Sequence, residues 1–80
     1  MKIEVRLFAT LAAYLPEESD GRTAALEVVL GSTVADVVRA FHIPEEVPFL
    51  TMVNGRDATP EQPLGDGDVL SLFPPLAGGL

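Results

Sequence analysis

The sequence predicts an α+β roll in which one mixed β-sheet wraps over one main helix. Apolar and polar residues alternate near both ends of the chain, which is the period-two pattern of half-buried strands. Between those ends, residues 33–41 repeat apolar side chains at helical spacing. The stripe that this helix would bury consists of Val34, Val37, Val38 and Phe41. Few residues remain for connections, so the helix and the strands must share one core.

The first expected strand has an inward row made of Ile3, Val5 and Leu7, which alternate with charged neighbours. Its outward row ends in Phe8, an aromatic side chain on the face that we expect to be exposed to water. Apolar residues then recur at helical spacing over residues 11–15, where a proline follows. We therefore expect a short helical segment directly after the first strand.

The second expected strand carries Leu26, Val28 and Leu30 on one face. The link between the two strands is longer than a tight turn, but the pair resembles a hairpin. Thr33 followed by Asp36 is a variant of the capping box that begins a helix. These residues predict where the main helix starts.

Residues 49–53 are apolar and lead into Asn54 and Gly55, the strongest short signal for a β-hairpin. Two prolines in residues 57–64 predict a loop or a short edge strand. A Gly-Asp turn precedes the last strand, residues 69–73. Its inward row is Leu70 and Leu72, and its outward row is Val69, Ser71 and Phe73. The first and last strands contain no proline, so we expect them at the centre of the sheet.

The composition indicates a single globular domain with an acidic surface. Twelve acidic residues against five basic ones give a net charge of −7, which repels phosphate backbones and favours basic protein surfaces as partners. The hydrophobic fraction of 48% is too high for a disordered acidic chain. Apolar runs fall short of the ~20 residues that cross a bilayer, and the N-terminus lacks a signal-peptide pattern. We expect a cytoplasmic protein that binds neither nucleic acid nor membrane. The chain has no cysteine, so it has no thiol of its own to carry sulfur.

No residue pattern indicates a catalytic or metal centre. His42 is the single histidine, at the end of the expected helix, and no nucleophile motif accompanies it. The glutamate pairs at 17–18 and 45–46 are adjacent residues in expected loops, a pattern typical of solvent-exposed charge. Asp66 and Asp68 alternate with glycine but lack the other ligands of a calcium loop. We therefore expect that the chain is not an enzyme.

The C-terminal residues carry the most information about function. Pro74 and Pro75 end the last strand and favour a stiff, extended polyproline segment. Beyond them, Ala77, Gly78 and Gly79 have almost no side chain. A tip without side chains can enter a narrow channel where any larger residue would clash.

These residues resemble the MoaD/ThiS family of ubiquitin-like sulfur carriers. The motifs that carry the resemblance are Phe8-Ala9 with Leu11, Val53-Asn54-Gly55-Arg56, Leu64-Gly65-Asp66-Gly67-Asp68-Val69 and Leu72-Phe73-Pro74-Pro75-Leu76-Ala77-Gly78-Gly79. The resemblance covers the whole chain. It implies a β-grasp fold, with the domain over residues 1–73 and an extended tail over residues 74–80. The paired prolines favour the small subunit of molybdopterin synthase over the thiazole-forming carrier.

The resemblance also implies a chemical role for the final glycine. In such carriers an activating enzyme uses ATP to adenylate the terminal carboxylate, and sulfur then replaces AMP to give a thiocarboxylate. This role would fall to Gly79, with Gly78 beside it. The implied partners are the large subunit of molybdopterin synthase, which would perform catalysis, and an adenylyltransferase of the ubiquitin-activating type. No cofactor would be bound permanently, because the activating partner uses the ATP.

We expect the partners to contact the outward sheet face and the tail. The expected partner-binding residues are Arg6, Phe8, Phe73, Pro74, Pro75, Leu76 and Ala77. Val69 and Ser71 share the outward face, and Arg56 is a candidate for its border. Two adjacent aromatic side chains on a wet sheet face are typical of a protein interface.

Leu80 departs from the family pattern, because with it the terminal carboxylate belongs to leucine. It is a residue left at a tag junction, a native residue removed by a protease, or the mark of a relative that never carries sulfur. Other functions also stay open. They are a carrier for thiamine or another sulfur pathway, a modifier joined to lysines through Gly79, and an interaction domain that uses only the aromatic residues.

Overall fold

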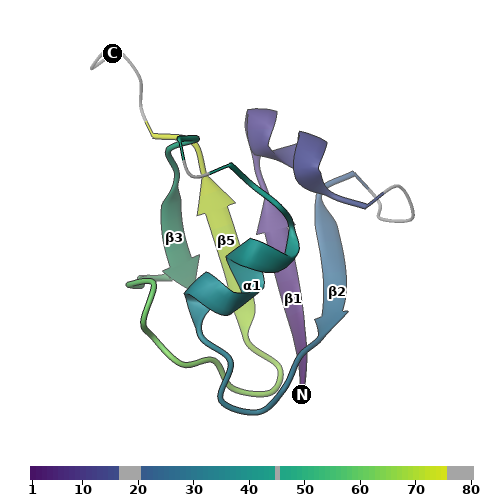
Figure 1. Cartoon of the computed structure of the whole chain (residues 1–80), viewed down its shortest axis with the longest axis vertical. Helices are drawn as coiled ribbons and strands as arrows, with labels where there is room; N and C mark the ends of the chain where they lie inside the picture. Colours follow the sequence, from purple (N-terminus) through teal and green to yellow (C-terminus); the bar gives the residue numbers. More distant parts are fainter. Residues whose placement is uncertain (17–20, 45, 76–80) are drawn as a thin grey trace.

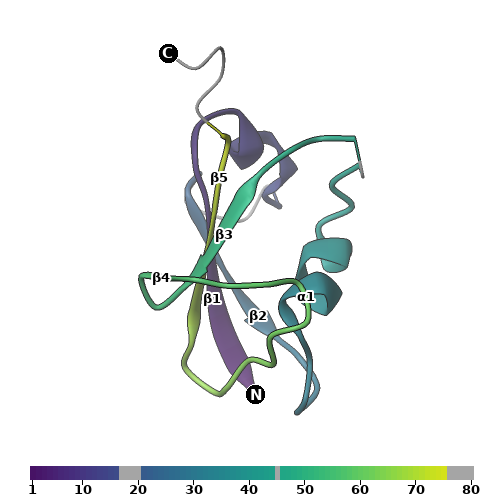
Figure 2. The same cartoon turned by 90° about the vertical axis from the view of Figure 1, so that its left-hand side faces the viewer.

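The computed structural model describes residues 1–16, 21–44 and 46–75. Its elements in chain order are β1 (Lys2–Leu7), the 3₁₀ helix η1 (Ala9–Tyr14), β2 (Thr23–Glu27), α1 (Val34–Ala40), β3 (Leu50–Val53), β4 (Arg56–Asp57) and β5 (Val69–Phe73). The strands form one sheet, and α1 lies across one face of it (Figure 1). Among the residues that the structure describes, no helix covers the opposite face (Figure 2).

The sheet has the strand order β2-β1-β5-β3-β4, which confirms that the first and last strands lie at its centre. β1 and β5 pair in parallel, with Leu7 opposite Leu72, and the other neighbouring strands are antiparallel. A mixed five-stranded sheet over one helix confirms the α+β roll and has the architecture of a β-grasp fold.

The core lies between this sheet and α1. Its buried residues are Ile3, Val5, Leu7, Leu11, Val34, Val37, Phe41, Val53, Leu64, Leu70 and Leu72. The inward rows expected for β1 and β5 are all 1% exposed or less, as strand alternation predicts. Burying these two rows beneath the helix is what fixes which sheet face stays open to solvent.

A capping box starts α1, as the sequence predicts. The Thr33 hydroxyl accepts from the Asp36 backbone N–H at 3.3 Å, and the Asp36 carboxylate accepts from the Thr33 N–H at 3.0 Å. Asp36 also pairs with Arg39 at 2.9 Å. The Thr33 backbone N–H first, and then Arg39, hold the pKa of Asp36 below its ordinary value of 3.8.

The second strand departs from the expectation at its far end. Leu30 is 78% exposed, so it does not share the inward face of Leu26. The Val28 N–H still donates to the Met1 carbonyl, but the chain then turns, and Val29 accepts two hydrogen bonds from Ser32. The turn carries Leu30 away from the core.

The segment after β1 also differs in type. The helical spacing over residues 11–15 predicted a short helix, and the chain forms the 3₁₀ helix η1, in which only Leu11 is buried. Such short 3₁₀ turns are common as connectors.

The Asn54-Gly55 hairpin joins β3 to β4, as predicted, with Val53 opposite Arg56. Asn54 has φ of 53° and Gly55 has φ of 84°, the positive pair that a type I′ turn requires. β4 is brief, and the residues after it form a loop, as the sequence allowed. Within the described part of the chain, no helix has the length and apolar character needed to cross a membrane.

Three side-chain hydrogen bonds join this hairpin, the turn before β5 and the start of β5. The Asn54 amide accepts from the Val69 N–H and donates to Asp68, both at 2.9 Å. The second Asp68 oxygen accepts from the Gly65 N–H at 2.7 Å. We call Asn54, Gly65 and Asp68 the turn clasp. Some residues of the motifs that resemble the MoaD/ThiS family therefore stabilise the fold.

Candidate partner-binding face and tail

Phe8 and Phe73 stack on the open face of the sheet, with ring centroids 4.5 Å apart and planes 6° from parallel. Leu7 lies opposite Leu72 in the parallel β1–β5 pair, so the next residue of each strand meets its counterpart. The Phe8 N–H donates to the Leu72 carbonyl at 3.1 Å, which extends the ladder to the aromatic pair. The structure confirms that the two rings face outward and are neighbours.

Leu50 extends this apolar surface onto β3. It lies directly opposite Phe73 in the antiparallel register and is 56% exposed. Paired residues of neighbouring strands share a face, so Phe8, Phe73 and Leu50 form one patch, which we call the aromatic face. The sequence did not reveal Leu50, because residues 49–53 are mostly apolar on both faces and lack an alternation that would assign them.

Polar residues border the aromatic face along β1. Arg6 lies opposite Ser71 in the register and its guanidinium donates to the exposed carboxylate of Glu4. Arg56 was a candidate for this border. It is exposed and lies opposite Val53 in the register.

The tail begins beside the aromatic face. Pro74 and Pro75 follow Phe73 directly and are half-buried. Because β5 runs parallel to β1, they leave the sheet at the end where Phe8 lies (Figure 1). The other expected tail residues, Leu76, Ala77, Gly78, Gly79 and Leu80, lie outside the described residues, and so do Glu17, Glu18 and Glu45.

The remaining polar candidates have structural positions. His42 is exposed, has φ of 58° and donates its N–H to the Arg39 carbonyl, so it ends the helix. The Asp66 carboxylate accepts from the Lys2 N–H at 2.7 Å. Among the described residues, no group of three histidine or acidic side chains is arranged to hold a metal ion.

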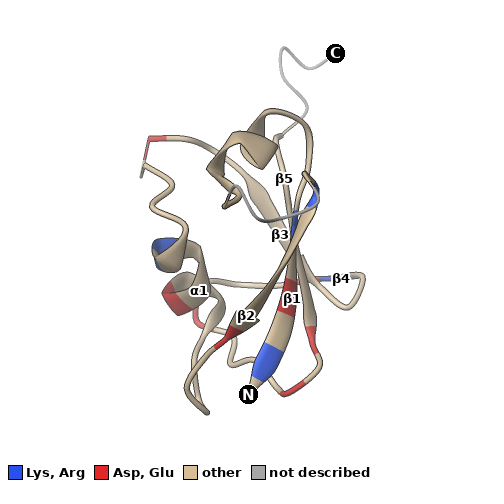
Figure 3. Ribbon diagram, turned by 90° about the vertical axis from the view of Figure 1, so that its right-hand side faces the viewer, with Lys and Arg blue, Asp and Glu red and all other residues tan. Residues whose placement is uncertain are grey.

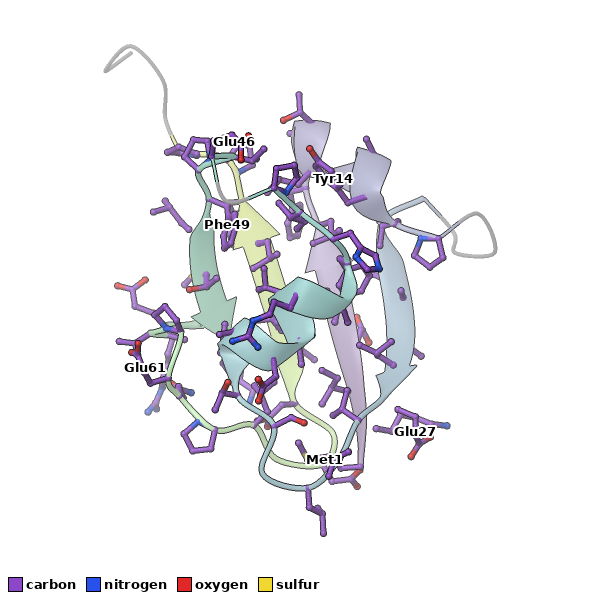
Figure 4. The ribbon with its side chains drawn as sticks, viewed as in Figure 1. Met1, Tyr14, Glu27, Glu46, Phe49 and Glu61 are labelled. Atoms are coloured by element: carbon purple, nitrogen blue, oxygen red, sulfur yellow. The ribbon has the colours of Figure 1, made fainter. Side chains whose placement is uncertain are left out.

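A pocket with a volume of about 650 Å³ lies between α1 and the β3–β4 hairpin. Its lining is mainly apolar and includes Val38, Phe49 and Pro60. Phe49 also packs against the core (Figure 4). Leu50 of the aromatic face is among its lining residues, whereas none of the described residues that the sequence predicted to bind partners is.

Residues 1–77 match the family described as Mut7-C ubiquitin. No curated protein matches the sequence. Among solved structures, SAMP1 from Haloferax volcanii is 27% identical with a TM-score of 0.77, covering 99% of this chain and 100% of that one. The putative molybdopterin converting factor subunit 1 from Pyrococcus furiosus is 25% identical with a TM-score of 0.71, covering 94% and 98%.

A third similar structure is the complex of subunits 1 and 2 of the molybdopterin-converting factor from Helicobacter pylori 26695. The matching chain is 24% identical with a TM-score of 0.62, covering 99% of this chain and 100% of that one. At that identity the likeness shows the fold alone.

Proposed function

The chain belongs to the Mut7-C ubiquitin family, and from this premise we propose that it is a sulfur carrier that holds sulfur as a thiocarboxylate on Gly79. The chain shares its fold with small ubiquitin-like proteins of the MoaD/ThiS type, which are not catalytic themselves. The carrier role accounts for sulfur chemistry in a chain without cysteine, because the sulfur atom is attached to a carboxyl carbon.

One observation carries the proposal: the aromatic face and the start of the tail meet on β5. Phe73 belongs to both, since it stacks on Phe8 and immediately precedes Pro74. A partner docked on the rings therefore stands next to the residues that lead to Gly79. This juxtaposition supports delivery of the tail into a partner's active site.

The chemistry requires little from the carrier. Once hydrolysis of the Gly79–Leu80 peptide bond has freed the Gly79 carboxylate, this carboxylate attacks the α-phosphate of ATP on the activating enzyme, forming an acyl-adenylate and releasing pyrophosphate. Hydrosulfide supplied by a partner then attacks the acyl carbon, AMP leaves with the C–O bond electrons, and loss of the S–H proton gives the thiocarboxylate. Glycine suits both steps, because no side chain hinders the acyl carbon. Partners supply the bases and the ATP site.

We assign the sulfur to molybdopterin synthesis, with this chain as the small subunit of molybdopterin synthase in the cytoplasm. The Pyrococcus relative is named as subunit 1 of a molybdopterin converting factor, which supports a large-subunit partner. Pro74 and Pro75 also favour this assignment over the thiamine pathway. The second partner is an adenylyltransferase of the ubiquitin-activating type.

The test is intact-mass spectrometry of residues 1–79 after incubation with the adenylyltransferase and a sulfur donor from the same genome. We expect a species in which one oxygen is replaced by sulfur. The matched control is the 1–80 chain, whose Leu80 carboxylate should stay unloaded. Absence of the sulfur species from 1–79, with acyl-adenylate formation by the enzyme intact on another carrier, would refute the proposal.

A second candidate is a protein modifier, which one comparison favours. The Haloferax relative with the TM-score of 0.77 is SAMP1, and a further structure of it is described as small archaeal modifier protein 1. In that function Gly79 would form isopeptide bonds with lysines. Lysine adducts of Gly79 in protein isolated from the native host would support the modifier, and thiocarboxylate alone would support the carrier.

A further inference from the structure

The basic residues of this chain are almost all arginines. Lysine occurs once in the sequence, at Lys2, and the other basic side chains are Arg6, Arg22, Arg39 and Arg56. The two residue types differ as nucleophiles. A lysine amine can lose its proton and attack an activated carboxyl, whereas a guanidinium group stays protonated in proteins. Lys2 is therefore the one side-chain amine in residues 1–80 that an activated Gly79 can acylate.

Lys2 lies at the end of the sheet opposite the tail. It begins β1, which pairs in parallel with β5, so the two strands end together at Phe8 and Phe73 (Figure 3). The backbone of Lys2 is held in place, because its N–H donates to the Asp66 carboxylate at 2.7 Å and its carbonyl accepts from the Gly67 N–H at 2.8 Å. The residue steps from Lys2 to Phe8 span about 20 Å at the rise of a β-strand.

The tail reaches Lys2 only at the limit of its length. Pro74 and Pro75 leave the sheet beyond Phe73, and two consecutive prolines favour a segment that continues in one direction. The residues from Pro75 to Gly79 span at most about 14 Å. A lysine side chain of about 6 Å just closes the remaining gap, and only if the end of the tail runs straight back along the sheet. Such a geometry removes most of the conformational freedom of the tail.

Two arginines occupy the end of the sheet from which the tail departs. Arg6 lies opposite Ser71, close to Phe73, and the Leu7 N–H donates to the Arg22 carbonyl at 3.0 Å. Position 6 is about 8 Å from Phe73 along and across the sheet, well within the reach of the tail. At the positions where an amine would meet the activated carboxyl, the chain therefore has guanidinium groups.

We propose that this arrangement keeps an activated Gly79 from acylating its own domain. The inference rests on the proposed function, since it takes Gly79 as the carboxyl that becomes activated. In the reaction that is avoided, a lysine amine attacks the acyl carbon, AMP leaves with the C–O bond electrons, and the amine proton passes to water. The product is a closed ring that cannot receive sulfur. Arginine near the tail and lysine far from it leave the activated carboxyl to acceptors on other molecules.

The experiment uses the 1–79 chain with its Gly79 carboxyl as a thioester, prepared by intein fusion, so that no activating enzyme is needed. Ring closure competes with hydrolysis of the thioester in every sample. Intact-mass spectrometry separates the products, because the ring is lighter by one water than the hydrolysed chain. The variant that combines Lys2→Arg with Arg6→Lys moves the lysine to the tail end without changing composition or net charge. We expect its ratio of ring closure to hydrolysis to exceed that of the unaltered chain by at least about tenfold.

A second probe combines Lys2→Arg with Thr10→Lys, because Thr10 is exposed on η1 at the same end of the sheet as Phe8. Circular dichroism checks that each variant is folded, and peptide mapping locates the ring bond. Excess ring closure at position 6 or 10 supports the proposal. Equal ratios in all three chains would overturn it. If all of them close, Lys2 is within reach of the tail, and if none closes, the arginines protect nothing.

The thioester separates this proposal from the one on which it rests. If the adenylyltransferase does not load the 1–79 chain but the relocated lysine closes the ring, the carrier function is wrong and the difference in ring closure remains. If loading succeeds and the ratios are equal, the carrier function stands and the protection of the domain is wrong.

Discussion

At the scale of single residues, each aromatic ring serves the fold and the surface together. Phe8 and Phe73 are half-buried, because each covers one face of the other while its outer side meets solvent. A stacked pair of this kind adds about 0.5–1.5 kcal/mol to stability beyond the area it buries. The rings are consequently held in place before a partner arrives, and little side-chain entropy is lost on docking.

The turn clasp gives a residue-scale prediction. Asp68→Asn leaves one acceptor oxygen where two donors, the Asn54 amide and the Gly65 N–H, now bind separate oxygens. We expect the free energy of unfolding to fall by about 1–2 kcal/mol, measured by urea denaturation. Asp57→Asn makes the same charge change at an exposed position and should be nearly neutral. An equal loss in both variants would mean that the clasp does not stabilise the hairpin.

At the scale of elements, the sequence predicted the positions of the strands better than their ends and their exposed faces. The sequence located β1 and β5, their inward rows and their central place in the sheet. Their side chains alternate strictly, so only one assignment of faces buries the apolar row against the helix. Leu30 was assigned to the wrong environment, because alternation alone does not show where a strand leaves the ladder. Leu50 was missed for the opposite reason, since an apolar run gives no signal of which face is open.

The same limit applies to the candidate site. The outward positions of Phe8 and Phe73 follow from alternation, but the place of Leu50 beside them depends on how β3 pairs with β5. The spacing of residues within one segment does not determine which distant segment it pairs with. Leu50 therefore became visible only with the three-dimensional fold.

The capping box of α1 gives an element-scale prediction about pH. The folded-state pKa of Asp36 is lowered, so its contribution to stability is complete above the unfolded pKa of about 3.9 and is lost as the pH falls through the folded value. We expect the Tm of the wild type to fall more below about pH 4 than that of Asp36→Asn. Thermal scans over this range, with Asp57→Asn as the control, measure the difference. Identical slopes for wild type and Asp36→Asn would contradict the bonding seen at the helix start.

At the scale of the whole molecule, negative charge surrounds the domain. The labelled acidic residues Glu27, Glu46 and Glu61 lie on different sides of it (Figure 4). With a net charge of −7, the domain attracts basic surfaces from a distance.

The division into domain and tail gives the prediction at this scale. Every buried core residue in the described structure lies between Ile3 and Leu72. Deleting residues 76–80 should change the free energy of unfolding by less than about 0.5 kcal/mol, and it should abolish the loading by the adenylyltransferase that is expected of the 1–79 chain. Denaturant unfolding of the 1–75 chain against the full chain tests this. A clear loss of stability would show that the tail belongs to the folded domain.

The parallel pairing of β1 with β5 has a mechanical consequence. The strand that carries the tail lies between β1 and β3 and is bonded to a neighbour on each side along its length. Tension applied at Pro74 along the strand axis loads these bonds together in shear, whereas an edge strand would be unzipped one bond at a time. A partner that pulls on the tail therefore applies force along the direction in which the sheet is most resistant, so the domain stays folded while the tail is under tension.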